Sequence, residues 1–294
     1  MRHRRTSLAM LLFVGAVTPC AAQTRLSEHG LVAQTVGGTT VTVEYYRPVS
    51  RGRTDLFGGV VTWGEDWTPG ANWATTIDVD HELRLEGTLL PKGKYSLWAI
   101  VRPDAWTIEL HRRVHLFHLA RPDSTDLQLR TSVRTDSGPH TEILTFDFPQ
   151  VGLGETTLRL RWGTMVVPIH FTMIAPPLRL LASAEQRARY VGRYDVVISP
   201  PDGSPPRQRV VDIADVADTL RWLDVEQGPA GRREFLLSPA GPDDAFTRAV
   251  RTPDGQFWRE AGLTLTFTMM NGRPEGFEVQ IDDGSVLARG KRRR

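Results

Sequence analysis

The sequence predicts an all-β protein, in which an antiparallel β-sandwich or jelly-roll-like domain is followed by a smaller β-barrel-like domain. Three observations indicate this fold class. Apolar and polar residues alternate with a period of two, turn residues recur at short intervals, and long helical periodicity is nearly absent. With 294 residues and 40% hydrophobic content, the chain is long enough for two domains that each bury a core.

The first part of the chain alternates most clearly. Residues 41–45, 106–110 and 158–162 each place their apolar side chains on one face, as half-buried strands do. Residues 95–101 are apolar on both faces, which is typical of a strand inside a sandwich. Pro168 predicts an edge strand over residues 165–173, because proline lacks a backbone N–H. Turn residues separate these segments at Gly37-Gly38, Pro69-Gly70, Pro91-Lys92-Gly93, Arg102-Pro103-Asp104 and Gly152-Leu153-Gly154.

The character of the sequence changes after residue 174, at Ala175-Pro176-Pro177. Ser183 is a suitable N-cap for a short helix that ends near residue 190, and alternation then resumes. Residues 265–270 and 277–281 predict a hairpin across a turn that contains Asn271-Gly272. We therefore expect a sandwich domain over residues 26–176, a linker with a short helix over 177–189, a barrel-like domain over 190–290 and a basic tail over 291–294.

The N-terminus has the layout of a secretory signal peptide. Three arginines precede an apolar run over residues 8–17, and small residues follow up to Ala22, where we expect cleavage. The apolar run is shorter than the roughly 20 residues that span a bilayer, so we expect no transmembrane segment in the mature chain. The protein is predicted to be exported, either to the periplasm or outside the cell. Cys20 is the only cysteine, so the mature chain would contain neither a disulfide nor a thiolate metal site.

The formal charge of +2 conceals an acidic body. Residues 1–22 carry three arginines and no acid, and residues 291–294 carry four more positive charges. The remaining 29 basic and 34 acidic residues leave a net charge of −5. This charge does not favour nucleic acid as a partner. The terminal positive charges are expected to form a solvated end.

A series of short motifs over about residues 28–175 resembles the bacterial family called domain of unknown function 2911. The residues that carry the resemblance are 34–38 (QTVGG), 46–48 (YRP), 51–53 (RGR), 57–59 (FGG), 70–72 (GAN), 74–76 (ATT) and 90–97 (LPKGKYSL). The resemblance implies an exported β-rich protein and implies no reaction. Two positions depart from the family pattern: Thr68 follows Trp67 where the family usually has arginine, and Trp73 follows Asn72 where an acidic residue is common.

The second domain is similar, over shorter motifs, to the lipocalin-like domain that follows some exported serine hydrolases. The matching segments are residues 190–194, residues 236–246 and the hairpin through Asn271-Gly272. That domain is an accessory, so the similarity assigns no catalytic residue.

The candidate ligand site is a turn cluster rich in aromatic and polar residues. Asn72 could present its amide to a ligand, Trp67 and Trp73 could stack on it, and Arg47 and Arg53 could bind an anionic or hydroxyl-rich group. The alternative is structural, because asparagine commonly stabilises turns and tryptophan is usually mostly buried.

The histidines offer a second candidate. His111, His115 and His118 would form one stripe on a helix and could then bind a metal. The preceding alternation continues as a strand, however, and on a strand His118 would face away from the other two. We therefore predict no metal and no cofactor.

Two functional hypotheses follow. The first is a non-catalytic binding module for a small molecule, a glycan or an envelope protein, because the sequence contains none of the common nucleophile or metal motifs. The second is a hydrolase that uses convergent carboxylates or a histidine-centred metal, since such groups assemble in space rather than in sequence. A scaffold whose second domain docks on a partner is a further possibility.

Overall fold

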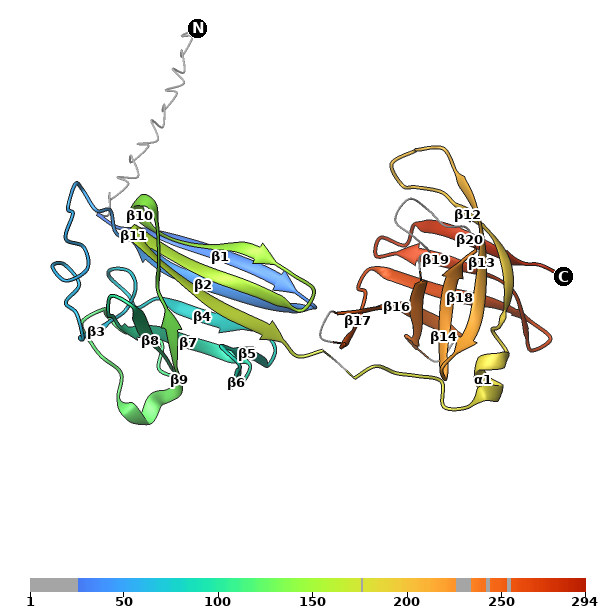
Figure 1. Ribbon diagram of the computed structural model, residues 1–294, viewed down its shortest axis with the longest axis horizontal. Coiled ribbons are helices and arrows are strands. Elements are labelled where there is room, and N and C mark those ends of the chain that lie inside the picture. Colours follow the sequence, from blue (N-terminus) through green and yellow to red (C-terminus); the bar gives the residue numbers. More distant parts are fainter. Residues whose placement is uncertain (1–25, 176, 226–233, 242–243, 253–254) are drawn as a thin grey trace, which may run out of the picture.

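The computed structural model describes residues 26–294 apart from 176, 226–233, 242–243 and 253–254. The predicted signal peptide lies outside the described residues. Nearly all regular structure is antiparallel β, as the sequence predicted, and it forms two units that are joined by an extended segment (Figure 1).

Two sheets form the first unit. The larger sheet has the order β1-β2-β4-β7-β8-β9, and β3 pairs with β7 beside this path. Its strands are β1 (Glu28–Val36), β2 (Thr39–Arg47), β3 (Asp66–Trp67), β4 (Thr76–Val79), β7 (Gly93–Ile100), β8 (Ala105–His111) and β9 (Leu127–Arg134). The smaller sheet has the order β10-β11-β5-β6, and its strands are β5 (Leu83–Leu85), β6 (Thr88–Leu90), β10 (Asp136–Val151) and β11 (Glu155–Met173).

The core of this sandwich lies between the two sheets. Alternate residues of β2, such as Val41 and Val43, pack there against residues of β11, such as Leu158 and Leu160. Strand β7 is buried on both faces, as predicted. Its inner residues join the core, and its outer residue Trp98 packs with Ala74 and Leu116.

The second unit is a closed barrel. Its strands follow the order β15-β14-β13-β12-β20-β19-β18-β16, and pairing of β15 with β16 closes the circle. They are β12 (Gly192–Ile198), β13 (Arg207–Val216), β14 (Thr219–Asp224), β15 (Glu234–Pro239), β16 (Ala245–Arg251), β18 (Leu263–Met270), β19 (Arg273–Ile281) and β20 (Val286–Arg292). Helix α1 (Ala184–Ala188) precedes the barrel, and Ser183 caps it as predicted, in a capping box with Gln186.

The two units meet at Trp258 in the short strand β17 (Phe257–Arg259), which pairs with β16 on the barrel side (Figure 1). The Trp258 side chain is 4% exposed and belongs to the sandwich core. It lies against Gly37, in the turn between β1 and β2, and Gly154, in the turn between β10 and β11. A Cβ on Gly37 would approach the indole to 2.2 Å, so only glycine permits this contact.

Glu142 of β10 anchors the loop that follows β2. Its carboxylate accepts hydrogen bonds from the Ser50 hydroxyl, from the His140 Nε2 at 3.1 Å and from the Arg51 backbone N–H at 2.7 Å. These donors, with Ser50 first, lower the pKa of Glu142 from 4.5 to about 2. The loop is thereby tied to the smaller sheet by an ionised carboxylate.

We expect Glu142→Gln to remove part of the acid sensitivity of the fold. Because the folded-state pKa is lowered, the ionised carboxylate stabilises the fold above about pH 4.5, and this contribution is lost as the pH falls toward 2. The melting temperatures of wild type and variant should therefore differ at pH 6 and converge near pH 2. Glu65→Gln, at an exposed position, is the control. A difference that is equal at both pH values would contradict this role.

Candidate functional site

An aromatic-walled groove of about 270 Å³ crosses the outer face of the larger sheet. Strands β2, β4 and β7 provide its floor, and two loops rise beside it. We call it the Trp73 groove. Its lining residues are His29, Glu44, Tyr45, Tyr46, Trp73, Ala74, Thr76, Lys94, Val114 and His115.

One wall of the groove is a stacked pair of rings. The Trp73 indole lies on the His115 imidazole with a centroid distance of 4.1 Å and an interplanar angle of 16°. Trp73 keeps 37% of its surface exposed, although Phe117 packs edge-on against it at 6.0 Å. The pair therefore presents a flat aromatic surface to solvent.

Backbone hydrogen bonds hold the two loops of this wall together. Asn72 adopts a left-handed conformation with a φ of 59°, which asparagine tolerates better than most residues. Its carbonyl accepts the backbone N–H of His118 at 2.8 Å and the Nδ1–H of the same residue at 3.0 Å. The N–H of Ala74 donates to the carbonyl of Leu116 at 2.8 Å. The position of Trp73 over His115 is thus fixed from both sides.

The rest of the groove combines rings with polar groups. His29 and Tyr46 meet at 5.3 Å and 67° on β1 and β2. Lys94 and Glu44 form an ion pair at 3.1 Å, in which each side chain is 38% exposed. Thr76 is buried, and its Oγ1 makes no hydrogen bond within the described part of the chain. The groove therefore offers ring faces together with donors and acceptors.

The structure does not gather the five residues that the sequence suggested. Trp73 lines the groove and Asn72 supports it, while the Asn72 side-chain amide donates to the Ser27 carbonyl at 3.3 Å. Arg47 donates to the Leu144 carbonyl at 3.4 Å and to Thr145 Oγ1 at 3.1 Å. Arg53 donates to the carbonyls of Ser50 and Val49, both at 2.8 Å. The two arginines thus hold backbone segments together.

Trp67 belongs to the core and lies away from the groove. Its ring stacks on Trp162 at 6.2 Å and meets Trp106 edge-on at 5.8 Å, and Phe57 completes the cluster. The geometry therefore favours a packing role for Trp67 over a role in ligand stacking. The short pairing of β3 with β7 turns Trp67 inward, and no local pattern in the sequence marks that pairing.

The three histidines are used separately. His111 is buried beside Glu109, His115 stacks on Trp73, and His118 binds the Asn72 carbonyl. Across the described residues, no group of three His, Cys, Asp or Glu side chains is placed to hold a metal ion.

A charge network that the sequence reasoning missed lies on the outer faces of β8 and β9. Glu109 is 1% exposed, and it pairs with His111 at 3.1 Å and with Arg130 through two contacts of 2.9 Å. Arg121 contacts Glu109 at 3.8 Å and Asp66 at 2.5 Å, and it thereby connects the two carboxylates. Glu109 occupies a polar position of an alternating strand, which predicts exposure. Residues 112–121 pack over this face instead, as the burial of Leu116 against Trp98 shows.

Asp66 has an unusual environment at the edge of this network. Burial raises the pKa of its carboxyl, Arg121 acts to lower the pKa, and the Glu109 carboxylate raises it. Its Oδ1 makes no hydrogen bond within the described residues. Glu109 and His111 have side-chain exposures of 1% and 3%, so the pair is sealed from solvent and from substrates in this conformation.

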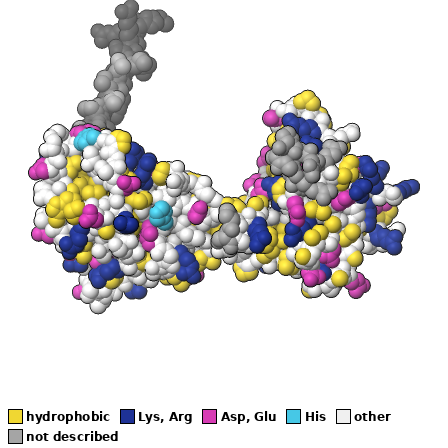
Figure 2. Space-filling model, viewed as in Figure 1, with side chains coloured by type: hydrophobic (Ala, Val, Ile, Leu, Met, Phe, Trp, Pro, Cys, Tyr) yellow, Lys and Arg dark blue, Asp and Glu magenta, His cyan; other side chains and the backbone are white. Residues whose placement is uncertain are grey.

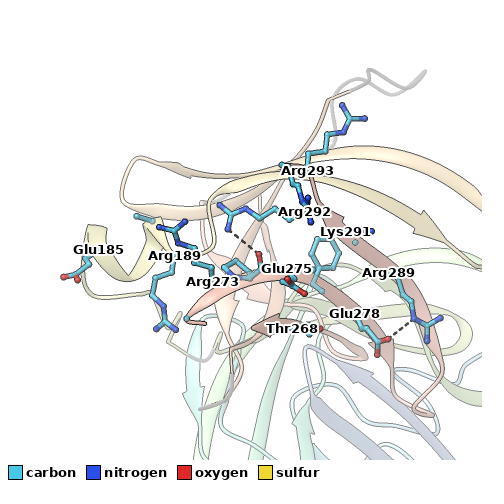
Figure 3. Close-up of a pocket in the computed structure, with 17 residues that line it drawn as sticks. Glu185, Arg189, Thr268, Arg273, Glu275, Glu278, Arg289, Lys291, Arg292 and Arg293 are labelled. Atoms are coloured by element: carbon cyan, nitrogen blue, oxygen red, sulfur yellow. Dashed lines mark hydrogen bonds and ion pairs between the residues drawn. The ribbon is translucent and has the colours of Figure 1, made fainter. Parts of the chain in front are cut away.

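A second, broader groove of about 1090 Å³ lies on the barrel, between α1 and strands β18 to β20 (Figure 3). Basic side chains gather at this end of the molecule (Figure 2). Several are already engaged: Arg289 pairs with Glu278 at 2.8 Å, Arg293 with Asp195 at 2.7 Å, and Arg292 donates to the Val191 carbonyl at 2.5 Å.

Lys291, Arg293 and Arg294 are exposed, as expected for a solvated basic end, but the first two residues of the predicted tail are part of a strand. Lys291 and Arg292 belong to β20, which pairs with β12 on one side and β19 on the other. Backbone pairing, which charge counting ignores, fixes these residues. Among the described residues, no helix has the length and hydropathy needed to cross a membrane.

Comparisons with known proteins identify the first domain only. No curated protein and no solved structure matches the chain significantly. No match confirms the similarity of the second domain to the lipocalin-like domain of serine hydrolases. Residues 27–171, which include nearly all of the sandwich and the Trp73 groove, match the model of the family described as Protein of unknown function (DUF2911), as the motifs of the first domain predicted.

Proposed function

We propose that the protein is an exported, non-catalytic binding module that holds a small hydroxyl-rich ligand, such as a sugar, in the Trp73 groove. The observation that carries the proposal is the stacked Trp73–His115 pair, which remains partly exposed at the groove wall. Flat apolar faces of sugar rings stack on such surfaces, and their hydroxyl groups require nearby polar partners.

The size and polarity of the groove support this ligand class. A volume of about 270 Å³ lies just below the roughly 300–1,000 Å³ of drug-sized pockets, so it suits one or two sugar rings. Glu44 can accept hydrogen bonds, Lys94 can donate them, and the two charges offset each other. A strongly charged ligand would meet no net field here, whereas a neutral hydroxyl-rich ligand meets both kinds of partner.

Binding is favoured over hydrolysis by the placement of the acids. The buried Glu109–His111 pair is inaccessible, and the groove carboxylate of Glu44 is held by Lys94. A glycosidase needs two accessible carboxyl groups on either side of the scissile bond.

We expect Trp73→Ala to weaken ligand binding on the order of tenfold, because the stacking surface is lost. Binding is measured by thermal shift and by quenching of tryptophan fluorescence with a panel of neutral mono- and disaccharides and N-acetylated sugars. Trp63→Ala is the matched control, since Trp63 is 38% exposed and lies outside the groove. The absence of saturable binding by any sugar, or equal weakening by both variants, would overturn the proposal.

The exported location rests on residues 1–22 alone. In a bacterial host with a general secretion pathway, the mature protein should be found outside the cytoplasm with Gln23 as its first residue. N-terminal sequencing of the fractionated protein checks this, and full-length protein that remains in the cytoplasm would contradict it.

A further inference from the structure

The interior of the barrel is close-packed at one end. Five aromatic rings pack together there at centroid distances of 4.9 to 6.1 Å, and each side chain is at most 4% exposed. They belong to Tyr190, Tyr194, Phe246, Phe267 and Phe277. Burial raises the pKa of both tyrosines to about 12, and the hydrogen bond that the Tyr190 hydroxyl donates to Asp244 acts in the same direction, so both rings stay neutral.

Beyond these rings the barrel interior contains a cavity of about 240 Å³. Strands β12, β14, β15, β16, β18, β19 and β20 all contribute to its wall, so the cavity lies inside the barrel. Trp222 lies between the packed end and the cavity, with its ring 5.4 Å from that of Phe277. The wall is mainly apolar and includes Ile198, Trp222, Leu237, Leu265, Val279 and Ala288.

The charged groups at the cavity are already paired. The Arg248 guanidinium lies 4.1 Å from the ring centroid of Phe235 and forms an ion pair with Glu260. Asp224 accepts a hydrogen bond from the Trp222 indole at 2.8 Å. A charged ligand would have to displace these partners and lose its own hydration. The cavity therefore favours an uncharged apolar ligand.

We propose that the barrel binds a small uncharged apolar molecule, with one aromatic ring or an alkyl chain of about eight carbons. The volume supports this size, since apolar cavities of about 150 Å³ already hold benzene. Side chains from seven of the barrel strands line the cavity, and burial of a ligand against them gains roughly 25 cal/mol per Å² of apolar surface. This site differs from the Trp73 groove in domain and in ligand chemistry, so either one can exist without the other.

The test uses the full-length mature protein and 1-naphthol, a fluorescent probe that is uncharged at neutral pH and whose fused ring system is close to 1-octanol in size. We expect saturable binding with one probe per chain and displacement by 1-octanol. Octanoate, which has the same chain length and a negative charge, should need at least tenfold higher concentration. If no saturable binding is seen, the proposal is overturned. If octanoate competes as well as octanol, its claim of an uncharged ligand is wrong.

Variants locate the probe in the barrel. Ala288→Phe places a ring in the cavity and should weaken probe binding at least tenfold. Val197→Phe is the matched control, because Val197 lies next to Ile198 on the same strand and is 41% exposed. Equal probe binding by wild type and Ala288→Phe, or equal loss in both variants, would overturn the location.

A second variant keeps the test informative if Ala288→Phe does not fold. Leu237→Ala enlarges the cavity, so it should retain the probe and increase the affinity for ligands bulkier than octanol, such as 1-dodecanol, relative to 1-octanol. An unchanged preference between the two alcohols would contradict the assignment of the cavity. Circular dichroism confirms that each variant is folded before it is compared.

Discussion

Trp258→Ala is expected to cost about 3–5 kcal/mol of stability and to separate the unfolding of the two domains. The indole is 4% exposed and belongs to the core of the sandwich although its strand, β17, pairs with the barrel. Its removal leaves a cavity between the two hairpin turns that hold it. Scanning calorimetry should show one cooperative transition for wild type and two for the variant.

Glycine substitutions in the first of these turns provide the matched test. Gly37 and Gly38 both have positive φ values, of 56° and 81°, so alanine is strained at either position. Only at Gly37 would the new Cβ meet the Trp258 ring, at 2.2 Å, whereas a Cβ on Gly38 meets no atom within 4 Å. Gly37→Ala should therefore destabilise the protein more than Gly38→Ala.

A double variant tests whether the contact between Gly37 and Trp258 causes these losses of stability. In the double variant Gly37→Ala/Trp258→Ala, the new Cβ at position 37 no longer meets an indole ring. The double variant should therefore lose less stability than the sum of the two single losses, by roughly 0.5–3 kcal/mol. Additive losses, or a single transition in Trp258→Ala, would mean that the indole does not connect the two domains.

The fold was predictable because its local signals agree with its global arrangement. Residues 41–45, 106–110 and 158–162 alternate, and each lies in a strand with one face in the core. Asn271 and Gly272, with φ values of 52° and 77°, form the tight turn of the β18–β19 hairpin, although the sequence indicated a longer connection. Such signals act over a few residues and do not depend on distant parts of the chain.

Pro168 shows where local reasoning is incomplete. Strand β11 has neighbours on both sides, β10 and β5, so the predicted edge strand was wrong as stated. The registered pairing with β10 ends at Val166, and the pairing with β5 begins at Phe171. Pro168 lies between these segments, where a missing N–H costs no ladder hydrogen bond. The rule for proline holds, but the place where the partners change depends on the whole fold.

The candidate site was less predictable, because it depends on which loops meet. Trp67 and Trp73 lie six residues apart in similar turn-rich sequence, yet one joins the core and the other the groove. His115 was considered only as a metal ligand, since its stacking on Trp73 requires a contact between loops 42 residues apart. The contact of Trp258 with the turns at Gly37 and Gly154 was not predictable for the same reason, because these segments are distant in the sequence.

The second large effect is expected at the buried charge network, where Glu109→Gln should cost about 3–5 kcal/mol. The substitution preserves the shape of the side chain and removes its charge. Arg130 then loses the carboxylate that compensates its charge, and His111 loses its carboxylate hydrogen-bond partner, at a site only 1% exposed. The loss of stability should lie toward the lower end of this range, because the Arg130 and Arg121 side chains are 54% and 52% exposed and can turn toward water.

The matched control for this prediction is Glu44→Gln, which breaks an ion pair of similar length in an exposed setting. The Glu44–Lys94 pair has a separation of 3.1 Å and side chains that are 38% exposed, so its loss should cost at most about 1 kcal/mol. Chemical denaturation at neutral pH in low and high salt distinguishes the two, because salt screens the exposed pair far more than the buried one. Equal costs for both variants would show that water reaches Glu109 and that residues 112–121 do not seal the network.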